Sequence, residues 1–274
     1  MLKDIVVNLS VGRTDNVACN YAVSLAEMFE AHVAGVAFAY EPVIPAVMGG
    51  IPAELIDSQW NENQQAAKAA LAHFDAAAKR ASVSADTRTL EASMPGAASA
   101  FGQIARRFDL SVVAQSEPDR TLPEELIIEA ALFDAGRPVL VVPYIHKQGA
   151  RLERVVVCWD GSRNAARAIA DAMPLLHRAK AVEVLIVASE GGKSTDVPGA
   201  DIGQHLARHG LKVDVKRITA DIEVADAILS HAADSGADLL VMGGYGHSRL
   251  REFILGGVTR SILQSMTVPV LMSH

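Results

Sequence analysis

The chain has 274 residues, of which 50% are hydrophobic and 21% charged, and its formal net charge is −7. Its mean hydropathy is +0.20 and its isoelectric point is about 5.7. This composition is typical of a globular protein with a large core. The acidic balance excludes a nucleic-acid-binding role that would depend on a basic surface.

The N-terminus enters a strand-like run directly, without the apolar region and small-residue cleavage site of a secretory signal. No apolar run reaches the ~18 residues that a membrane-spanning helix needs. Cys19 and Cys158 are the only two cysteines, and we expect them to be small buried hydrophobes rather than a disulfide. The sequence therefore predicts a cytoplasmic protein that does not bind membranes.

Short apolar runs alternate with segments of helical periodicity along the first half. Strands are predicted at 5–9, 32–40, 87–91, 110–114 and 138–143, and helices at 16–29, 53–81, 96–108 and 124–133. Thr14 and Asp15 are the candidate N-caps of the first helix. The long helix 53–81 is expected to cover the core with Trp60, Leu71 and Phe74.

The same series begins again after the polar segment 146–153. Strands are predicted at 155–159, 182–187, 213–218, 238–242 and 269–272, and helices at 162–176, 202–209, 222–235 and up to 264. Residues 109–113 match 238–242, 138–141 match 269–272, and 5–7 match 155–157. We therefore expect an α/β protein of two repeated open-sheet domains, residues 1–147 and 151–274, each a five-stranded parallel sheet with helices on both faces.

The stretch 239–259 carries clustered glycines directly after a predicted strand. Gly243, Gly244 and Gly246 are followed after nine residues by Gly256 and Gly257. Glycine permits positive φ and lets the backbone approach a ligand, so such clusters commonly mark an anion-binding turn. A tight turn followed by a helix C-cap is the alternative interpretation.

The two copies differ at this stretch in charge. The first copy has carboxylates there, at Glu117, Asp119, Glu124, Glu125 and Glu129, and a single glycine, Gly136, near the end of the stretch. The carboxylates stabilise a helix N-terminus and repel phosphate. The second copy instead has Arg249, Arg251 and Arg260. An anionic ligand is therefore expected in the second half.

With its repeat and its glycines, the chain resembles the universal stress protein family, in the tandem form with two such domains, over essentially its whole length. The family's nucleotide motif is Gly, two residues, Gly, nine residues, Gly, then Ser or Thr. Gly243, Gly246 and Gly256 match this spacing. Gly257 stands at the last position, where the backbone N–H remains but the hydroxyl is lost, and Thr259 carries a hydroxyl two residues on.

The resemblance implies a fold like that of adenine nucleotide alpha hydrolases, related to the Rossmann fold. It also implies ATP, AMP or ADP bound beyond the C-terminal strand ends, with Mg²⁺ if the ligand is ATP. The phosphates would face N–H groups of the glycine turn and the following helix. Asp160 would bind ribose or base polar groups, and the main chain of Val187 would read the adenine edge. The other residues implied in the site are Trp159, Met242, His247, Val258 and Thr259.

Asp160 also has an interpretation that needs no ligand, and its counterpart in the first copy differs. Asp160 can equally form an Asx turn or N-cap with Ser162. In the first copy Ser10 stands opposite Asp160, so the carboxylate is missing there.

Three other residue patterns do not match the motifs that they partly resemble. The segment GGKST at 191–195 lacks the first Walker A glycine, because Val187 stands there. His205 and His209 share a helix face but have no third ligand nearby in sequence. No nucleophile and base are recognisable, so neither catalytic residues nor a metal site are predicted.

The sequence thus favours a stress-response protein that binds an adenine nucleotide in its C-terminal half and acts by binding or signalling rather than by catalysis. The alternatives are an interaction module of the same family that binds no nucleotide, and a slow ATP hydrolase. The last strands of the two copies, 138–143 and 269–272, are expected to pair antiparallel within one chain, which would cover both edges. A homodimer is a further option.

Overall fold

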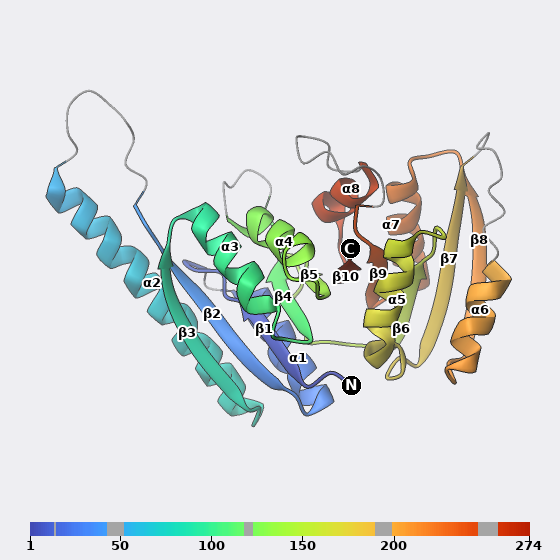
Figure 1. Cartoon of the computed structure of the whole chain (residues 1–274), viewed down its shortest axis with the longest axis horizontal. Coiled ribbons are helices and arrows are strands. Elements are labelled where there is room, and N and C mark those ends of the chain that lie inside the picture. Colours follow the sequence, from blue (N-terminus) through green and yellow to red (C-terminus); the bar gives the residue numbers. More distant parts are fainter. Residues whose placement is uncertain (14, 43–51, 118–122, 190–198, 246–256) are drawn as a thin grey trace. The chain divides into compact units, whose positions relative to one another are not determined.

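The computed structural model describes residues 1–13, 15–42, 52–117, 123–189, 199–245 and 257–274 (Figure 1). The chain forms two compact units. The first unit comprises Leu2–Arg137 and Lys147–Ala150. The second unit comprises Pro138–His146 and Arg151–His274, with Met1.

Strands and helices alternate through both units, as the sequence predicts. In the first unit they are β1 (Asp4–Asn8), α1 (Val17–Phe29), β2 (His32–Tyr40), α2 (Ala53–Arg80), β3 (Ala85–Ala92), α3 (Met94–Ala105), β4 (Leu110–Ala114) and α4 (Glu124–Phe133). In the second unit they are β5 (Val139–Val142), β6 (Arg154–Cys158), α5 (Arg163–Leu176), β7 (Ala181–Ser189), α6 (Gly199–Arg208), β8 (Val213–Ala220), α7 (Val224–Ser235), β9 (Leu239–Gly243), α8 (Gly257–Ser265) and β10 (Val270–Ser273).

Each unit is built on an open, mainly parallel sheet. In the first unit the strand order is β3-β2-β1-β4, with all pairs parallel. In the second unit β10-β9-β6-β7-β8 are parallel, and β5 joins antiparallel to β10 with Val141 opposite Val270. The predicted α/β class with a parallel-dominated sheet is confirmed. β5 follows the first copy in the repeat but lies in the sheet of the second unit.

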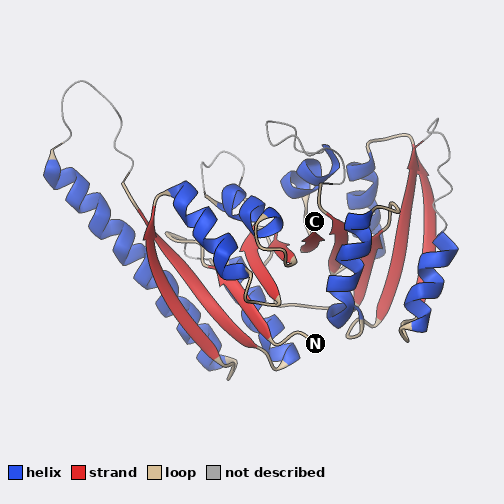
Figure 2. Ribbon diagram, in the orientation of Figure 1, coloured by secondary structure: helices blue, strands red, loops and turns tan. Residues whose placement is uncertain are grey.

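Helices cover both faces of each sheet (Figure 2). α1 contacts α2, whereas α3 contacts α4; in the second unit α7 contacts α8. Crossover connections between parallel strands are right-handed. Where the chain changes the direction in which it adds strands to the sheet, the connecting helices therefore change to the opposite face. The covered central strands are therefore continuous apolar runs, and Ile5, Val6 and Val7 of β1 are fully buried.

The long helix α2 covers the core through its C-terminal half. Phe74 is fully buried, and a Cβ added to Gly35 of β2 would come within 2.8 Å of the Phe74 ring. The expected role of Phe74 is therefore confirmed. Trp60 and Leu71 are only half-buried.

The N-cap prediction for the first helix was wrong. The side chain of Asn16, not Thr14 or Asp15, accepts a hydrogen bond from the Cys19 backbone N–H, at 3.2 Å. Asn16 is buried and its amide oxygen reaches the first turn, whereas Thr14 lies outside the described residues. In the second unit Ser162 caps α5 by accepting from the Ala165 backbone N–H, at 3.1 Å.

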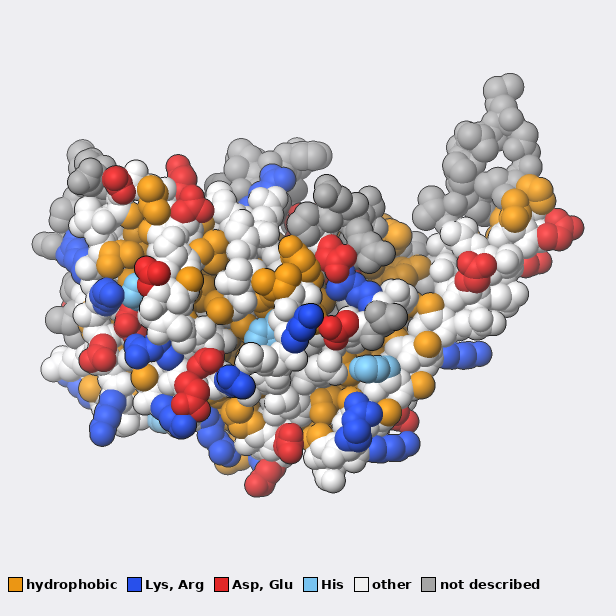
Figure 3. Space-filling model, turned by 180° about the vertical axis from the view of Figure 1, so that it is seen from behind, with side chains coloured by type: hydrophobic (Ala, Val, Ile, Leu, Met, Phe, Trp, Pro, Cys, Tyr) orange, Lys and Arg blue, Asp and Glu red, His pale blue; other side chains and the backbone are white. Residues whose placement is uncertain are grey.

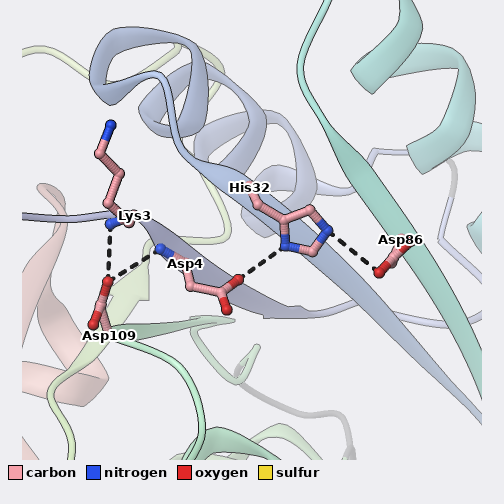
Figure 4. Close-up of polar contacts among 5 residues, drawn as sticks. All are labelled: Lys3, Asp4, His32, Asp86 and Asp109. Carbon is pink, nitrogen blue, oxygen red and sulfur yellow. Dashed lines mark hydrogen bonds and ion pairs between the residues drawn. The ribbon is translucent and has the colours of Figure 1, made fainter.

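An aspartate repeated in both copies fastens the amino ends of the central strands. Asp109 Oδ2 accepts from the backbone N–H groups of Lys3 and Asp4, at 2.8 and 3.1 Å (Figure 4). Asp238 Oδ2 does the same for Glu153 and Arg154, at 2.9 Å in both cases. This aspartate therefore has a structural role, at the end of the sheet opposite the strand carboxyl ends.

Beside Asp109 a histidine joins three strands of the first unit. His32 Nδ1 of β2 lies 2.9 Å from Asp4 Oδ1 of β1. Its Nε2 lies 3.4 Å from Asp86 Oδ2 of β3 (Figure 4). These contacts link neighbouring strands at the amino end of the sheet.

Candidate functional site

The described residues of the sequence-predicted site lie at the carboxyl end of the second sheet. From β6 the chain runs to β7 on one side, and from β9 it runs to β10 on the other, so the gap between β6 and β9 is a topological switch point. Ligands of open α/β sheets bind outside the strand carboxyl ends at this point.

The described site residues come from three strand ends and one helix start. Trp159 and Asp160 follow β6, Val187 lies near the end of β7, Met242 and Gly243 end β9, and Gly257, Val258 and Thr259 form the first turn of α8. The predicted residues Gly246, His247 and Gly256 lie outside the described residues, as do Arg249, Arg251 and the segment 191–195.

Val187 has its main chain turned toward the switch point. β6 pairs with β7 up to Cys158 opposite Leu185, and the Trp159 backbone N–H donates to Leu185 O at 2.9 Å. Because main-chain polar groups alternate in direction along a strand, those of Val187 point to the same side as those of Leu185. β6 has ended on that side, so the N–H and C=O of Val187 face the place where a ligand would lie.

Asp160 forms the Asx turn that was its alternative interpretation. Its Oδ1 accepts from the Ser162 backbone N–H at 2.9 Å, and its side chain is exposed. Trp159 is half-buried, and its indole Nε1 is shielded from solvent without a hydrogen-bond partner among the described residues. Asp160 thus opens α5 while it stays accessible at the strand end.

The two described motif glycines have different physical reasons to be glycine. A Cβ on Gly243 would lie 2.7 Å from both Ala165 N and Asn164 C of α5, so the close approach of β9 to α5 requires glycine. No described residue comes within 4 Å of a Cβ added to Gly257. Gly257 is exposed, so packing against the described residues does not require glycine at this position.

The side chain of Thr259 forms a hydrogen bond with the turn that follows β9. It is buried, and its Oγ1 accepts from the Tyr245 backbone N–H at 3.1 Å. Asn164 and His274 also contact this turn, through Gly244 O. Sequence reasoning missed both, because neither residue belongs to a recognisable spacing and their partners are distant in the chain.

The corresponding end of the first sheet is filled with charged and polar side chains. Arg13 forms an ion pair with Glu117, at 2.5 Å, and its side chain is 9% exposed. Ser10 and Glu124 are each 3% exposed. Burial raises the pKa of Glu124, while Arg13 and Ser10 nearby oppose the rise. These carboxyl groups disfavour a phosphate ligand in the first unit.

Neither cysteine is a reactive thiolate at neutral pH. Burial raises the pKa of the Cys19 thiol to about 12, with Arg80 opposing. Burial, with help from the Asp160 charge, raises the pKa of Cys158 to about 12. Nucleophilic attack needs the thiolate, so both side chains serve packing.

His205 lies on α6 and His209 directly follows the end of that helix, with the two ring centroids 4.8 Å apart. Within the described ranges no group of three or more His, Cys, Asp or Glu side chains is arranged to hold a metal ion. The two rings therefore contact each other without a third ligand in the part of the chain that is described.

Basic and acidic side chains are interspersed over the described surface seen in Figure 3. Such mixing favours solubility over binding to a polyanion. None of the helices in the described ranges is both long and apolar enough to cross a membrane.

Comparison with known proteins gives a family match over the second half and similar relatives of the same family. The family model described as the universal stress protein family matches residues 151–274. The universal stress protein YxiE of Bacillus subtilis is 31% identical, over 43% of this chain and 96% of the relative. The universal stress protein Slr1230 of Synechocystis sp. is 29% identical over 149 residues, which cover 53% of this chain and 49% of that relative, about half of its length.

Solved structures extend the likeness of fold to both halves. A universal stress protein from Archaeoglobus fulgidus superposes with a TM-score of 0.71 at 16% identity, over 98% of this chain and 97% of that one. A protein of unknown function from Pseudomonas aeruginosa gives a TM-score of 0.64 at 15% identity, over 99% of this chain and 92% of that one.

Proposed function

The chain belongs to the universal stress protein family, and on that premise we propose that it binds an adenine nucleotide, ATP, in its second half. The ligand would lie at the carboxyl ends of β6, β7 and β9, against the first turn of α8. AMP or ADP would use the same base and ribose contacts.

One observation carries the proposal: the main chain of Val187 faces the switch point after β6 has ended. A backbone N–H and C=O in this position can pair with the edge of a base. β7 continues to Ser189, so these groups are held at a fixed place in the sheet.

The other described residues fit the remaining parts of a nucleotide. The exposed carboxylate of Asp160 can accept from ribose hydroxyls or base polar groups. A phosphate would meet the N–H groups of Gly257 and Val258 at the start of α8, where no described residue lies near the side-chain position of Gly257. Mg²⁺ would be held largely by the ATP phosphates and water, as is usual for this ion.

We propose a role in binding or signalling during stress rather than in catalysis, because no nucleophile paired with a general base is recognisable among the described site residues. A family member that binds no nucleotide and acts only through protein contacts is the second candidate. The observation in its favour is Gly257 at a position where the family motif has a hydroxyl.

The test is calorimetric titration of the purified full-length chain with ATP, with one site per chain as the expected result. Gly257→Val places methyl groups beside the α8 N-terminus and is expected to weaken ATP binding about tenfold or more. Asp160→Ala is expected to weaken it as well. The unfolding midpoint of the Gly257→Val variant should stay close to that of the wild type.

Ser10→Ala is the matched control for Asp160→Ala, because Ser10 is the counterpart of Asp160 in the first half. It is expected to leave ATP affinity unchanged. A wild-type chain with no measurable ATP affinity that gains it on Gly257→Ser would favour the second candidate. If ATP binding is lost on Ser10→Ala and kept on Asp160→Ala, the ligand binds in the first half, which would contradict the proposal.

We further propose that the two sequence copies pair through their last strands, β5 and β10, within one chain. Such pairing covers strand edges that would otherwise be open to aggregation. Association of two chains into a homodimer and a cytoplasmic location complete the proposal.

A further inference from the structure

The turn after β9 is fastened to two neighbouring elements. The Gly244 backbone N–H donates to Ser273 O of β10 at 2.8 Å, and the Tyr245 backbone N–H donates to Thr259 Oγ1 of α8 at 3.1 Å. Tyr245 has a φ of +50°, a left-handed conformation that residues other than glycine rarely adopt. The surrounding contacts must therefore stabilise this conformation.

Asn164 and His274 meet the carbonyl side of the same turn. Asn164 is 5% exposed, and its Nδ2 lies 2.7 Å from Gly244 O and 3.3 Å from Tyr245 O. The Asn164 Nδ2 and His274 Nδ1 atoms are 3.1 Å apart. His274 Nδ1 also lies 3.1 Å from Gly244 O.

These side chains can be satisfied with either tautomer of His274. If Nδ1 accepts, the two Asn164 amide protons go to Gly244 O and to Nδ1. If Nδ1 carries the proton, it donates to Gly244 O, and the second Asn164 proton turns to Tyr245 O. In both arrangements Gly244 O accepts a hydrogen bond from a buried donor.

Holding Gly244 O decides where the next N–H points. In a trans peptide the C=O of one residue and the N–H of the next point in opposite directions. Directing Gly244 O at Asn164 therefore directs the Tyr245 N–H away from α5, toward Thr259 Oγ1. Thr259 is the third residue of α8, so this bond ties the first turn of α8 to β9.

We propose that Asn164 and His274 are positioning residues for the nucleotide site. Their side chains hold the Gly244–Tyr245 peptide, and through Thr259 they hold the α8 N-terminus where its N–H groups can meet phosphate. The inference rests on the proposed function for its ligand and on the described hydrogen bonds for its geometry. Residues that orient the groups in contact with a ligand in this way are sensitive to small changes.

The main variant is Asn164→Asp, which keeps the side-chain size but replaces the donor by a carboxylate facing two carbonyl oxygens. It is measured by the hydrogen-exchange rate of the Tyr245 amide and by calorimetric ATP titration of the full-length chain. We expect exchange at least about tenfold faster and ATP binding at least about tenfold weaker. Asn164→Ala, which adds no charge, provides the same readouts if the first variant does not fold.

Two further substitutions separate positioning from general stability. Asn16→Asp is the matched control, because Asn16 is equally buried at the start of α1 and an aspartate keeps its capping oxygen. It should change neither readout. His274→Ala should speed exchange and weaken ATP binding, while His274→Asn, whose amide can take the place of Nδ1, should restore both in part.

Each outcome decides the inference. Unchanged exchange at Tyr245 in both Asn164 variants overturns it, whatever happens to ATP affinity. Faster exchange with wild-type ATP affinity also overturns it, because the turn would then not position the site. If the wild type binds no ATP, the proposed function fails on its own, and exchange alone shows whether Asn164 and His274 hold the turn.

Discussion

Glu124 is the residue that most clearly separates the two halves. It is the first residue of α4 and is 3% exposed, at the end of the first sheet that corresponds to the candidate site. Burial is the largest influence on this carboxyl group and raises its pKa above the ordinary value. Arg13 beside it is already paired with Glu117. The carboxyl groups of this region therefore disfavour the phosphates of ATP or of another ligand.

Replacing Glu124 by glutamine is expected to stabilise the protein more at pH 8 than at pH 4. Because the pKa of Glu124 is raised in the folded state, this carboxyl group contributes its full stability to the fold below the ordinary glutamate pKa, where it is protonated. That contribution to stability is lost as the pH rises through the folded-state pKa and Glu124 ionises. Glutamine cannot ionise, so the Glu124→Gln variant avoids this loss. Thermal unfolding at the two pH values measures the difference.

Glu54 is the control for this prediction, because it also lies in the first turn of a helix, α2, but is exposed. Glu54→Gln should shift the unfolding midpoint equally little at both pH values. A Glu124→Gln variant whose stability gain is the same at pH 4 and pH 8 would contradict the assignment.

At the scale of elements, the two motif glycines act on different parts of the fold. Gly243 lets the end of β9 approach the N-terminal turn of α5, and Gly257 begins α8 with no described residue near its side-chain position. The first glycine therefore has a packing reason that does not depend on a ligand. The second glycine has no such packing reason in the described structure.

Gly243→Ala is expected to destabilise the fold by about 1–3 kcal/mol, because the added methyl would overlap backbone atoms of Asn164 and Ala165. Gly257→Ala is the matched control and should change stability by less than about 0.5 kcal/mol. Chemical denaturation of both variants measures the difference. Equal midpoints for the two variants would show that β9 and α5 can separate without cost.

At the scale of the whole chain, β5 decides how the two sequence copies are related. It belongs to the first copy in the repeat, yet all four of its residues are buried within the second unit. The division into residues 1–147 and 151–274 stays a prediction. The second structural unit already includes Pro138–His146 with β5, whereas the second sequence copy begins at residue 151. The pairing of β5 with β10 can be tested directly in the intact chain.

Val141→Cys combined with Val270→Cys is expected to form a disulfide within one chain under mild oxidation. Residues directly opposite in an antiparallel pair have Cβ atoms close enough for such a bond. Non-reducing electrophoresis measures it, and the raised pKa values of Cys19 and Cys158 keep the native thiols from competing.

Val141→Cys combined with Leu271→Cys is the control, because neighbouring residues of a strand point to opposite faces. It should remain reduced. A disulfide that joins two chains in the Val141/Val270 variant would mean that the last strands pair between chains, as in a homodimer. Absence of any cross-link in the Val141/Val270 variant would contradict the pairing of β5 with β10.

The sequence predicted much of the local structure and part of the site. The alternation of strands and helices follows from periodicity within each segment, which is local information. The Asx turn at Asp160 and the cap at Ser162 are likewise formed by residues two or three apart. The N-cap of α1 was missed because three adjacent residues could cap equally well, and only the folded chain selects Asn16.

By itself the amino-acid sequence determined the repeat, the fold class and the family resemblance, and it predicts which half of the chain would hold an anion. Only the tertiary structure decided that Asn164 and His274 contact the turn after β9, that the close approach of α5 requires glycine at position 243, and that β5 lies in the second unit. The physical reason is distance along the chain. Asn164 is 80 residues from Gly244 and 110 from His274, and no local pattern records contacts that form only when separate elements pack.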